Sequence, residues 1–386
     1  MCSIAGEIDF SRCLDIKDYH KNMISSMKRR GPDDDGIYRE KNAVLLHARL
    51  SVIDVEKGRQ PMTFAYRGET YTIVYNGELY NTKELKEKLK SLGIKFETNS
   101  DTEVLLKLYA LYGKECVNML NGIFAFAVWE KNAKRLFLAR DRIGVKPLFY
   151  HKCSGRLVFA SEIKTILMHP EIDAVIDKKS ISELMLIGPG RTPGYGVFKG
   201  INEIKRGHLA YFDKDGLRIE KYWDVTAKKH TDSKDLTIEK VRFLVKDAIE
   251  RQLVSDVPIG TFLSGGLDSS IISSVAASYM KKRGERLTTF SVTYRDNDKY
   301  FKKSRFQPNS DEMYIDIMQK YLDSNHHMIV IDTPELADAL KKAVDARDLP
   351  GMADVDSSLL LFCQEIKKYV TVALSGECAD EYEHTC

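Results

Sequence analysis

The sequence lacks both a long apolar run and an excess of charge of either sign. None of its apolar stretches approaches the ~20 residues that a membrane-spanning helix needs. Its 386 residues carry a net charge of +3, and the charged residues, 30% of the chain, are evenly mixed. This composition argues against a membrane protein and gives no electrostatic basis for nucleic-acid binding, so we expect neither kind of partner.

Cysteine shows no pattern of a disulfide framework or of a metal site. Seven cysteines are scattered without paired, short spacing, at positions 2, 13, 116, 153, 363, 378 and 386. The first residues also lack the charged, apolar and small-residue zones of a secretory leader. We therefore expect reduced thiols and a cytoplasmic location.

The length and the apolar periodicity predict two domains. The first, over residues 1–210, is predicted to be a sheet-rich α+β domain. In its first predicted helix, Leu85, Leu89 and Leu92 share one face and Gly93 terminates the helix; Ser100 and Glu103 form a capping-box pattern at the start of the second. The predicted elements are helices at 82–92 and 100–111 and antiparallel strands at 123–129, 135–139, 148–150 and 156–160.

A linker is expected over residues 211–236, where the polar stretch 227–235 has no apolar period. Strands then alternate with helices, which predicts an α/β domain with a parallel sheet over 237–386. Its predicted strands lie at 259–263, 287–294, 327–331 and 370–374, and its first helices at 237–253, 269–280 and 311–322. The predicted buried face of the helix at 237–253 comprises Ile238, Val241, Leu244, Val245, Ala248, Ile249 and Leu253.

Cys2 directly follows the initiator methionine, and so small a side chain normally permits removal of Met1. The freed α-amine of Cys2 would titrate near ~7.7 to 8.0 and could accept the proton of its own thiol at neutral pH. Nucleophile and base would then come from one residue. Position alone, however, is more typical of an incidental cysteine near the start of a chain.

Five further motifs occur in a fixed order. They are Cys2-Ser3-Ile4-Ala5-Gly6, Arg30-Gly31-Pro32-Asp33, His47-Ala48-Arg49-Leu50-Ser51, Tyr75-Asn76-Gly77-Glu78-Leu79-Tyr80-Asn81 and Ser100-Asp101-Thr102-Glu103. Any one alone is weak, since Asn76-Gly77 by itself is more typical of a tight turn. Together they resemble the class II glutamine amidotransferases over residues 2–210. The resemblance implies an N-terminal nucleophile hydrolase fold, which is an αββα sandwich.

The same resemblance implies roles for six residues. Cys2 would attack the amide of glutamine, and the Asn76 side chain with the Gly77 N–H would form the oxyanion hole. Arg49 would bind the α-carboxylate of glutamine, whereas Glu78 and Asp101 would bind its α-ammonium group.

A second candidate site follows the strand predicted at 259–263. The sequence Ser264-Gly265-Gly266-Leu267-Asp268-Ser269-Ser270 opens a helix, so glycines, hydroxyls and helix N–H groups could cradle a phosphate. It lacks the Gly-Lys-Ser/Thr ending of a Walker loop and the Gly-x-Gly-x-x-Gly spacing of a dinucleotide site. A Gly-Gly turn before a helix is uninformative by itself.

The full string resembles the PP-loop of ATP pyrophosphatases. With Phe290-Ser291-Val292 and Leu374-Ser375-Gly376-Glu377, it resembles the asparagine synthetase family. That resemblance implies ATP and Mg²⁺, with Asp268 and Asp380 holding the metal and Glu377 beside the reacting carboxyl group. The residues implied to bind ATP are Leu263, Ser264, Gly265, Gly266, Asp268, Ser269, Val292, Ser375 and Gly376.

The two halves together imply a glutamine-dependent asparagine synthetase that uses glutamine, aspartate and ATP. Ammonia released at Cys2 would pass internally to the second site and amidate β-aspartyl-AMP. Residues 354–358 are candidates for the acceptor site. Two alternatives remain open: an amidotransferase that acts on another carboxylate, and a non-catalytic glutamine-binding assembly subunit. Family analogy implies a homodimer.

The end of the chain departs from the family pattern. After Gly376-Glu377 the family usually has Gly-x-Asp-Glu, then an apolar residue and two glycines, whereas this chain has Cys378 and ends at Cys386. We therefore expect a fragment or frameshifted product whose ATP-pyrophosphatase domain is incomplete and whose synthetase activity is impaired.

Overall fold

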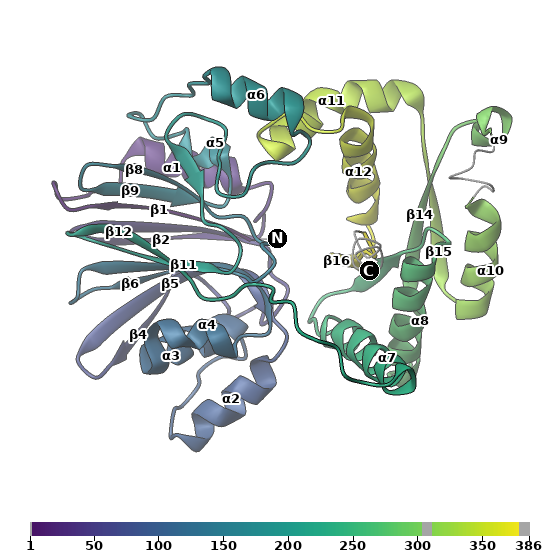
Figure 1. Cartoon of the computed structure of the whole chain (residues 1–386), viewed down its shortest axis with the longest axis horizontal. Helices are drawn as coiled ribbons and strands as arrows, with labels where there is room; N and C mark the ends of the chain where they lie inside the picture. Colours follow the sequence, from purple (N-terminus) through teal and green to yellow (C-terminus); the bar gives the residue numbers. More distant parts are fainter. Residues whose placement is uncertain (1, 303–310, 378–386) are drawn as a thin grey trace. The chain divides into compact units, whose positions relative to one another are not determined.

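A computed structural model describes residues 2–302 and 311–377, and it divides the chain into two compact units, Met1–Lys228 and Lys229–Cys386 (Figure 1). Each unit has its own sheets and its own apolar core. Among the described residues, no helix is both long enough and apolar enough to cross a membrane.

The first unit contains two six-stranded antiparallel sheets. One has the order β10-β8-β9-β1-β3-β2, and the other has the order β12-β11-β7-β6-β5-β4. The strands of the first sheet are β1 (Ser3–Asp9), β2 (Asp34–Glu40), β3 (Ala43–Arg49), β8 (Phe149–Cys153), β9 (Arg156–Ala160) and β10 (Ile201–Glu203). Those of the second are β4 (Met62–Tyr66), β5 (Glu69–Leu79), β6 (Gly122–Glu130), β7 (Arg135–Arg140), β11 (His208–Asp213) and β12 (Gly216–Lys221).

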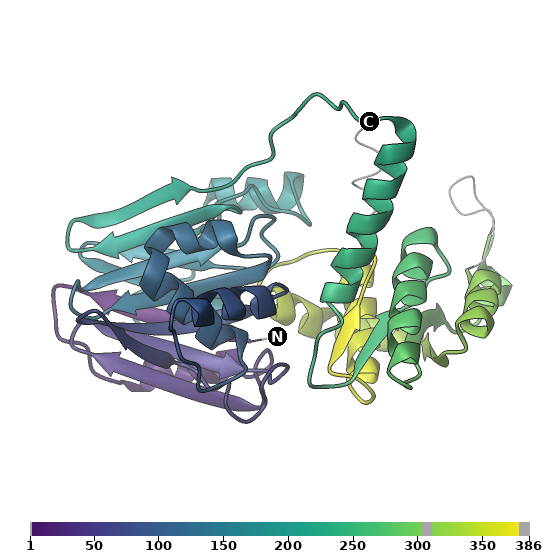
Figure 2. The ribbon, with the colours of Figure 1, turned by 90° about the horizontal axis from the view of Figure 1, so that it is seen from below.

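Apolar side chains fill the space between the two sheets. They also pack between the outer face of each sheet and the helices that cover it. Ile4, Ile8 and Leu45 of the first sheet pack against Val74 and Trp129 of the second. On the outer face of the second sheet lie α2 (Thr82–Ser91), α3 (Asp101–Tyr112), the short η1 (Gly113–Glu115) and α4 (Cys116–Met119). Helices α1 (Asp18–Met27) and α5 (Ile163–Ile166) cover the first sheet, and α6 (Lys178–Leu186) follows. The layers are therefore αββα, which confirms the predicted fold (Figures 1 and 2).

Two details of the predicted helices are wrong. Leu92 is 54% exposed, because α2 ends at Ser91 and only Leu85 and Leu89 reach the core. The capping box is only half formed: the Ser100 hydroxyl accepts the Glu103 N–H at 3.2 Å, but the Glu103 carboxylate accepts N–H groups from Glu97 and Thr98. Glu103 therefore fixes the loop before α3 and does not cap the Ser100 N–H.

The predicted domain boundary at residue 210 is too early. Strand β11 continues to Asp213 and pairs with β7, and β12 then pairs with β11 through Lys221. These pairings place much of the expected linker within the second sheet, and the first compact unit ends at Lys228. Only the polar stretch at 227–235 coincides with the junction.

The second unit is a four-stranded parallel sheet with the order β15-β14-β13-β16, as predicted. Its core divides between two faces, since Val372 and Leu374 pack with α7 and α8, whereas Ala373 packs with α12. Its strands are β13 (Ile259–Phe262), β14 (Thr288–Tyr294), β15 (Asn325–Ile331) and β16 (Val372–Leu374). Its helices are α7 (Lys234–Arg251), α8 (Leu267–Lys282), α9 (Asn297–Tyr300), α10 (Glu312–Leu322), α11 (Thr333–Arg347) and α12 (Ala353–Ile366).

Most of the predicted buried face of α7 is exposed. Ile249, in the last turn of α7, and Leu253, just after the end of this helix, pack against Ala276 and Met280 of α8. Earlier in the helix, the exposed fractions of Val241 and Leu244 are 53% and 61%. The apolar period correctly identified the helix, but only its last turn reaches the core of this unit.

Candidate active sites

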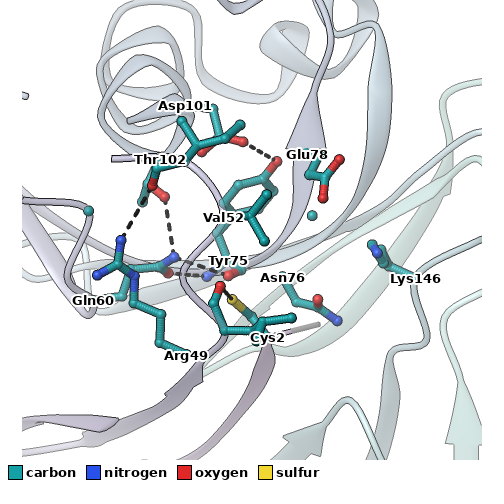
Figure 3. Close-up of a pocket in the computed structure, with 14 residues that line it drawn as sticks. Cys2, Arg49, Val52, Gln60, Tyr75, Asn76, Glu78, Asp101, Thr102 and Lys146 are labelled. Atoms are coloured by element: carbon teal, nitrogen blue, oxygen red, sulfur yellow. Dashed lines mark hydrogen bonds between the residues drawn. The ribbon is translucent and has the colours of Figure 1, made fainter. Parts of the chain in front are cut away.

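Six predicted residues of the first unit line one pocket. Cys2 precedes β1, Arg49 ends β3, and Asn76, Gly77 and Glu78 lie near the end of β5. Asp101 is the first residue of α3. The pocket therefore forms where strand ends from both sheets meet the start of a helix. Figure 3 shows the side chains of all these residues except Gly77 around it.

Cys2 is held as a protonated thiol in this pocket. Its sulfur donates to the carbonyl oxygen of Leu50 at 3.5 Å, and burial raises the pKa of the thiol. The Arg30 guanidinium donates to the Cys2 carbonyl at 3.3 Å and so fixes the backbone of the nucleophile. A thiol in this state needs a base before it can attack a carbonyl carbon.

Asn76 carries a buried amide with no protein partner. The residue is 1% exposed, and neither its Nδ2 nor its Oδ1 has a hydrogen-bond partner among the described residues. Such a group is costly unless a ligand satisfies it. At the adjacent Gly77, a Cβ atom would lie 2.3 Å from the Ile123 carbonyl oxygen, so only glycine allows β5 to approach β6 here. The amide is therefore available to a substrate.

The Arg49 guanidinium is held by the loop that follows β3. It donates to the carbonyl oxygens of Val55 at 2.9 Å, Ile53 at 3.3 Å and Asp54 at 2.7 Å. Carbonyl oxygens orient the cation without neutralising its charge, so Arg49 can still attract a carboxylate.

Two carboxylates of the pocket have raised pKa values because they are buried. The pKa of Asp101 rises to about 6, although hydrogen bonds from Leu79 and Tyr75 oppose the rise. The pKa of Glu78 is also raised by burial, and the nearby Lys146 ammonium opposes that shift. Both acids are therefore placed where a substrate cation would stabilise their charged forms.

Sequence reasoning assigned no role to four polar residues of this pocket, Gln60, Tyr75, Thr102 and Lys146, although Tyr75 and Thr102 stand within two of the motifs. Taken singly, each of these residues has an ordinary structural explanation. Tyr75 is typical of any strand, and Gln60 and Lys146 lie in loops whose course the sequence alone does not reveal. Only their convergence through long-range pairing indicates a role.

Asp141 shapes the loop that carries Lys146. Its fully buried carboxylate accepts five backbone N–H groups: Oδ1 from Ile143, Gly144 and Val145 at 3.2, 2.6 and 3.0 Å, and Oδ2 from Lys146 and Phe124 at 3.0 and 3.3 Å. One carboxylate thus accepts hydrogen bonds from the backbone N–H groups of four consecutive residues, 143–146, and from that of Phe124.

We expect Asp141→Ala to lower the free energy of unfolding of the first unit by roughly 3 to 5 kcal/mol, because five donors lose their acceptor. Both tryptophans, Trp129 and Trp223, lie in this unit, so urea unfolding followed by tryptophan fluorescence reports on it alone. The control is Asp224→Ala, which removes an exposed ion pair with Lys221 and should leave the unfolding midpoint close to that of the wild type. Equal midpoints for the two variants would contradict the account.

The second unit brings most of the predicted nucleotide residues to one cavity. Eight of the nine line it, together with Glu377: Leu263, Ser264, Gly266, Asp268, Ser269, Val292, Ser375 and Gly376. Gly265 does not line it but has a φ of +81°, and a Cβ there would lie 2.8 Å from the Tyr314 Cβ. Gly265 therefore allows the loop to turn beneath α10. Asp380 lies outside the described residues.

The loop is closed by its own hydroxyls at the start of α8. The Ser269 hydroxyl accepts the Ser264 N–H at 3.2 Å and donates to the Gly266 carbonyl at 3.1 Å. At the end of β16, a Cβ on Gly376 would lie 3.0 Å from the Asp268 Cβ, so this strand end adjoins the loop. The arrangement exposes helix N–H groups to an anion at the carboxyl edge of a parallel sheet.

The donor atoms of this cavity fit Mg²⁺. The carboxylates of Asp268, Glu377 and Asp311 line it. Mg²⁺ prefers oxygen and commonly takes one or two carboxylates together with substrate phosphates. No group of three or more His, Cys, Asp or Glu residues that could hold a metal ion occurs within 2–302 and 311–377. Sequence reasoning missed Asp311, which directly precedes α10.

Comparisons with known proteins match both units. Residues 1–223 match the family described as glutamine amidotransferase domain, and residues 240–383 match the family described as asparagine synthase. The chain is 53% identical over 383 residues to a glutamine-hydrolysing asparagine synthetase 3 of Bacillus subtilis, covering 99% of this chain and 62% of the relative.

Two further relatives give the same result. A glutamine-hydrolysing asparagine synthetase 1 of Bacillus subtilis is 36% identical, with 99% of this chain and 58% of the relative covered. A Methanocaldococcus jannaschii protein provisionally named glutamine-hydrolysing asparagine synthetase 2 is 35% identical, with 99% and 75% covered. The chain thus spans about three fifths of the length of the two Bacillus relatives.

Proposed function

The chain belongs to the family of glutamine-hydrolysing asparagine synthetases, and from this premise we propose that it hydrolyses glutamine at Cys2 and amidates ATP-activated aspartate. The observation that carries the proposal is the unpartnered Asn76 amide, buried in one pocket with a thiol, an arginine and two carboxylates. This combination suits an amide substrate that bears a carboxylate at one end and an ammonium group beside it.

In the glutaminase half, the α-amine of Cys2 takes the thiol proton and the thiolate attacks the amide carbon of glutamine. The carbonyl electron pair moves to oxygen, where the Asn76 amide and the Gly77 N–H stabilise it. The protonated amine gives its proton to the leaving nitrogen, and ammonia departs to leave a thioester on Cys2. Water then attacks the thioester carbon, and glutamate and the free thiol are released.

Substrate recognition uses the two charged walls of the same pocket. Arg49, already oriented by three loop carbonyls, binds the α-carboxylate of glutamine. Asp101 and Glu78 bind the α-ammonium group, and this contact offsets the cost of keeping both acids charged.

In the second unit, the β-carboxylate of aspartate attacks the α-phosphorus of ATP, and the bond to the β-phosphate breaks to release pyrophosphate. The loop 264–270 and the start of α8 bind the phosphates. Mg²⁺, held by Asp268 with Asp380 as a further ligand, would neutralise phosphate charge when bound. Glu377 lies beside the reacting carboxyl group, and ammonia displaces AMP from the acyl carbon.

Three finer points belong to the same proposal. Residues Val355 and Ser358 line the nucleotide cavity, which supports an acceptor site at the start of α12. A cytoplasmic location follows from the need for ATP and free amino acids, and a homodimer from family analogy. Two assays test the proposal: purified protein with glutamine should release glutamate, and whatever pyrophosphate it releases from ATP, even at a reduced rate, should require added aspartate. Glutamate release with a different required carboxylate would reassign the acceptor.

The raised pKa of Asp101 predicts the pH dependence of the glutaminase half. The folded-state pKa is about 6, so the carboxylate that binds the α-ammonium group is lost as pH falls through 6. The Cys2 α-amine, which titrates near ~7.7 to 8.0, lowers kcat/KM for glutamine as pH falls through that range. We expect the Asp101 ionisation to appear as a second, steeper decline below about pH 6, and Asp101→Asn to remove this second ionisation from the profile. The same ionisation in the Asn variant would show that another group titrates there.

A further inference from the structure

Tyr75 connects the two ends of the glutamine pocket, although no motif assigns it a role. It lies on β5 directly before Asn76 and is 2% exposed. Its hydroxyl donates to Asp101 Oδ2 at 3.0 Å (Figure 3). The Leu79 N–H donates to the same oxygen at 3.2 Å. The Asp101 side chain is therefore oriented mainly by β5, and the Thr102 N–H of its own helix adds a further hydrogen bond.

The backbone of Tyr75 is fixed just as firmly. Its N–H donates to Gln60 Oε1 at 2.7 Å, and its carbonyl oxygen accepts Gln60 Nε2 and His47 Nε2, each at 3.2 Å. The carbonyl of Tyr75 and the N–H of Asn76 belong to one planar peptide unit. The two hydrogen bonds that hold this carbonyl therefore also fix the position of the Asn76 N–H.

Gln60 takes the place of a missing strand. The pairing of β4 with β5 ends at Met62 opposite Ile73, and the same antiparallel register continued by two residues would bring Gln60 opposite Tyr75. There the side-chain amide of Gln60 supplies both the donor and the acceptor that a strand backbone would supply. Its Nε2 also reaches Thr102 Oγ1 at 3.2 Å, one residue after Asp101.

Building on the function proposed above, we propose that Tyr75 is a positioning residue of the glutaminase site. Its hydroxyl holds Asp101 as the charged partner of the α-ammonium group, and its peptide, bracketed by Gln60, holds Asn76 at the oxyanion. One residue thus aligns both ends of the substrate.

The charge of Asp101 should respond to loss of this hydroxyl. The charged and titratable groups that face the pocket around Asp101 are Tyr75 and Glu78 of β5, Cys2 before β1, Arg49 of β3 and Lys146 after β7. Hydrogen bonds from Tyr75 and Leu79 favour the ionised carboxylate, whereas burial and Glu78 favour the protonated acid. Without the hydroxyl, the pKa of Asp101 rises further, and less of the carboxylate is charged at neutral pH.

The first test compares Tyr75→Phe with Tyr109→Phe. Tyr109 is 1% exposed and also donates its hydroxyl to a buried carboxylate, that of Glu130, but it does not line the pocket. We expect Tyr75→Phe to raise KM for glutamine at least about fivefold at pH 7, to change kcat less than twofold, and to regain a near wild-type KM at pH 8.5. Tyr109→Phe should match the wild type. A KM raised equally at every pH would overturn the role assigned to the hydroxyl.

The second test concerns the peptide of Tyr75. Gln60→Leu removes both bonds to that peptide but leaves the Asp101 carboxylate bonds intact. We expect kcat to fall at least tenfold with the midpoint of the acid limb unchanged, and Gln60→Glu, which cannot donate to the Tyr75 carbonyl, should not restore it. An unchanged kcat in Gln60→Leu would overturn this part.

Glutamine binding separates this inference from the proposed function. Calorimetric titration of glutamine into Cys2→Ala and into Cys2→Ala with Tyr75→Phe, at pH 6 to 8.5, needs no turnover. Weaker binding by the double variant at pH 7, with recovery at pH 8.5, supports the inference even if the wild type releases no glutamate, a result that would refute only the proposed function. Equal binding at every pH overturns the inference.

Discussion

Cys2→Ala is expected to reduce glutamate release by at least about 10³-fold, because the pocket contains no second nucleophile at that position. Binding of glutamine should survive, since Arg49 and Asp101 do not depend on the sulfur for their positions. Glutamate release by coupled assay, with glutamine binding by calorimetry, measures both effects.

Cys153→Ala is the matched control for this experiment. Cys153 is an exposed, unpaired cysteine at the end of β8 and does not line the pocket. Its replacement should leave glutamate release unchanged. Residual activity of Cys2→Ala above about one tenth of the wild-type value would show that a different group performs the attack.

Asn76→Ala is expected to lower kcat for glutamate release by about 10² to 10³-fold, the usual cost of removing one oxyanion donor. KM should change little, because the amide contributes to the transition state more than to the bound substrate. The Asn76→Ala variant should lose activity without losing stability. The amide has no partner in the protein, so its removal should leave the free energy of unfolding unchanged or raise it by up to about 1 kcal/mol.

The opposite behaviour is expected of Asn42→Ala. The Asn42 side chain is also buried, but its Nδ2 donates to the Asp9 carbonyl at 2.8 Å. This variant should lose about 1 kcal/mol of stability and keep its activity. If Asn76→Ala were destabilised as much as Asn42→Ala, its amide would have a structural partner and the oxyanion assignment would fail.

Local sequence patterns correctly predicted the two folds, several strands and helices, and six residues of the glutamine pocket. The αββα fold and six pocket residues followed from motifs that resemble the class II glutamine amidotransferases, whereas the parallel sheet followed from the alternation of strands with helices. Strand and helix alternation located β13, α8 and β14 within a few residues. Each motif and each predicted strand or helix is a local pattern, although the motifs themselves are spread over residues 2–103.

What the sequence did not reveal depends on contacts between distant segments. Gln60 becomes important only because β4 begins at Met62, so the edge of Tyr75 that faces away from β6 has no strand partner. The pairing of β11 with β7 joins segments about 70 residues apart, which is why the first domain was drawn too short. The apolar periodicity of α7 predicts a helix, but it does not indicate how much of the apolar face other elements bury.

In the proposed mechanism, a freed terminal amine activates the sulfur of Cys2. Intact-mass spectrometry of the purified protein, run beside the glutamate assay, tests it most directly. We predict that the active protein lacks the initiator methionine and begins with Cys2. A preparation that keeps this methionine and still cleaves glutamine at the full rate would contradict the claim.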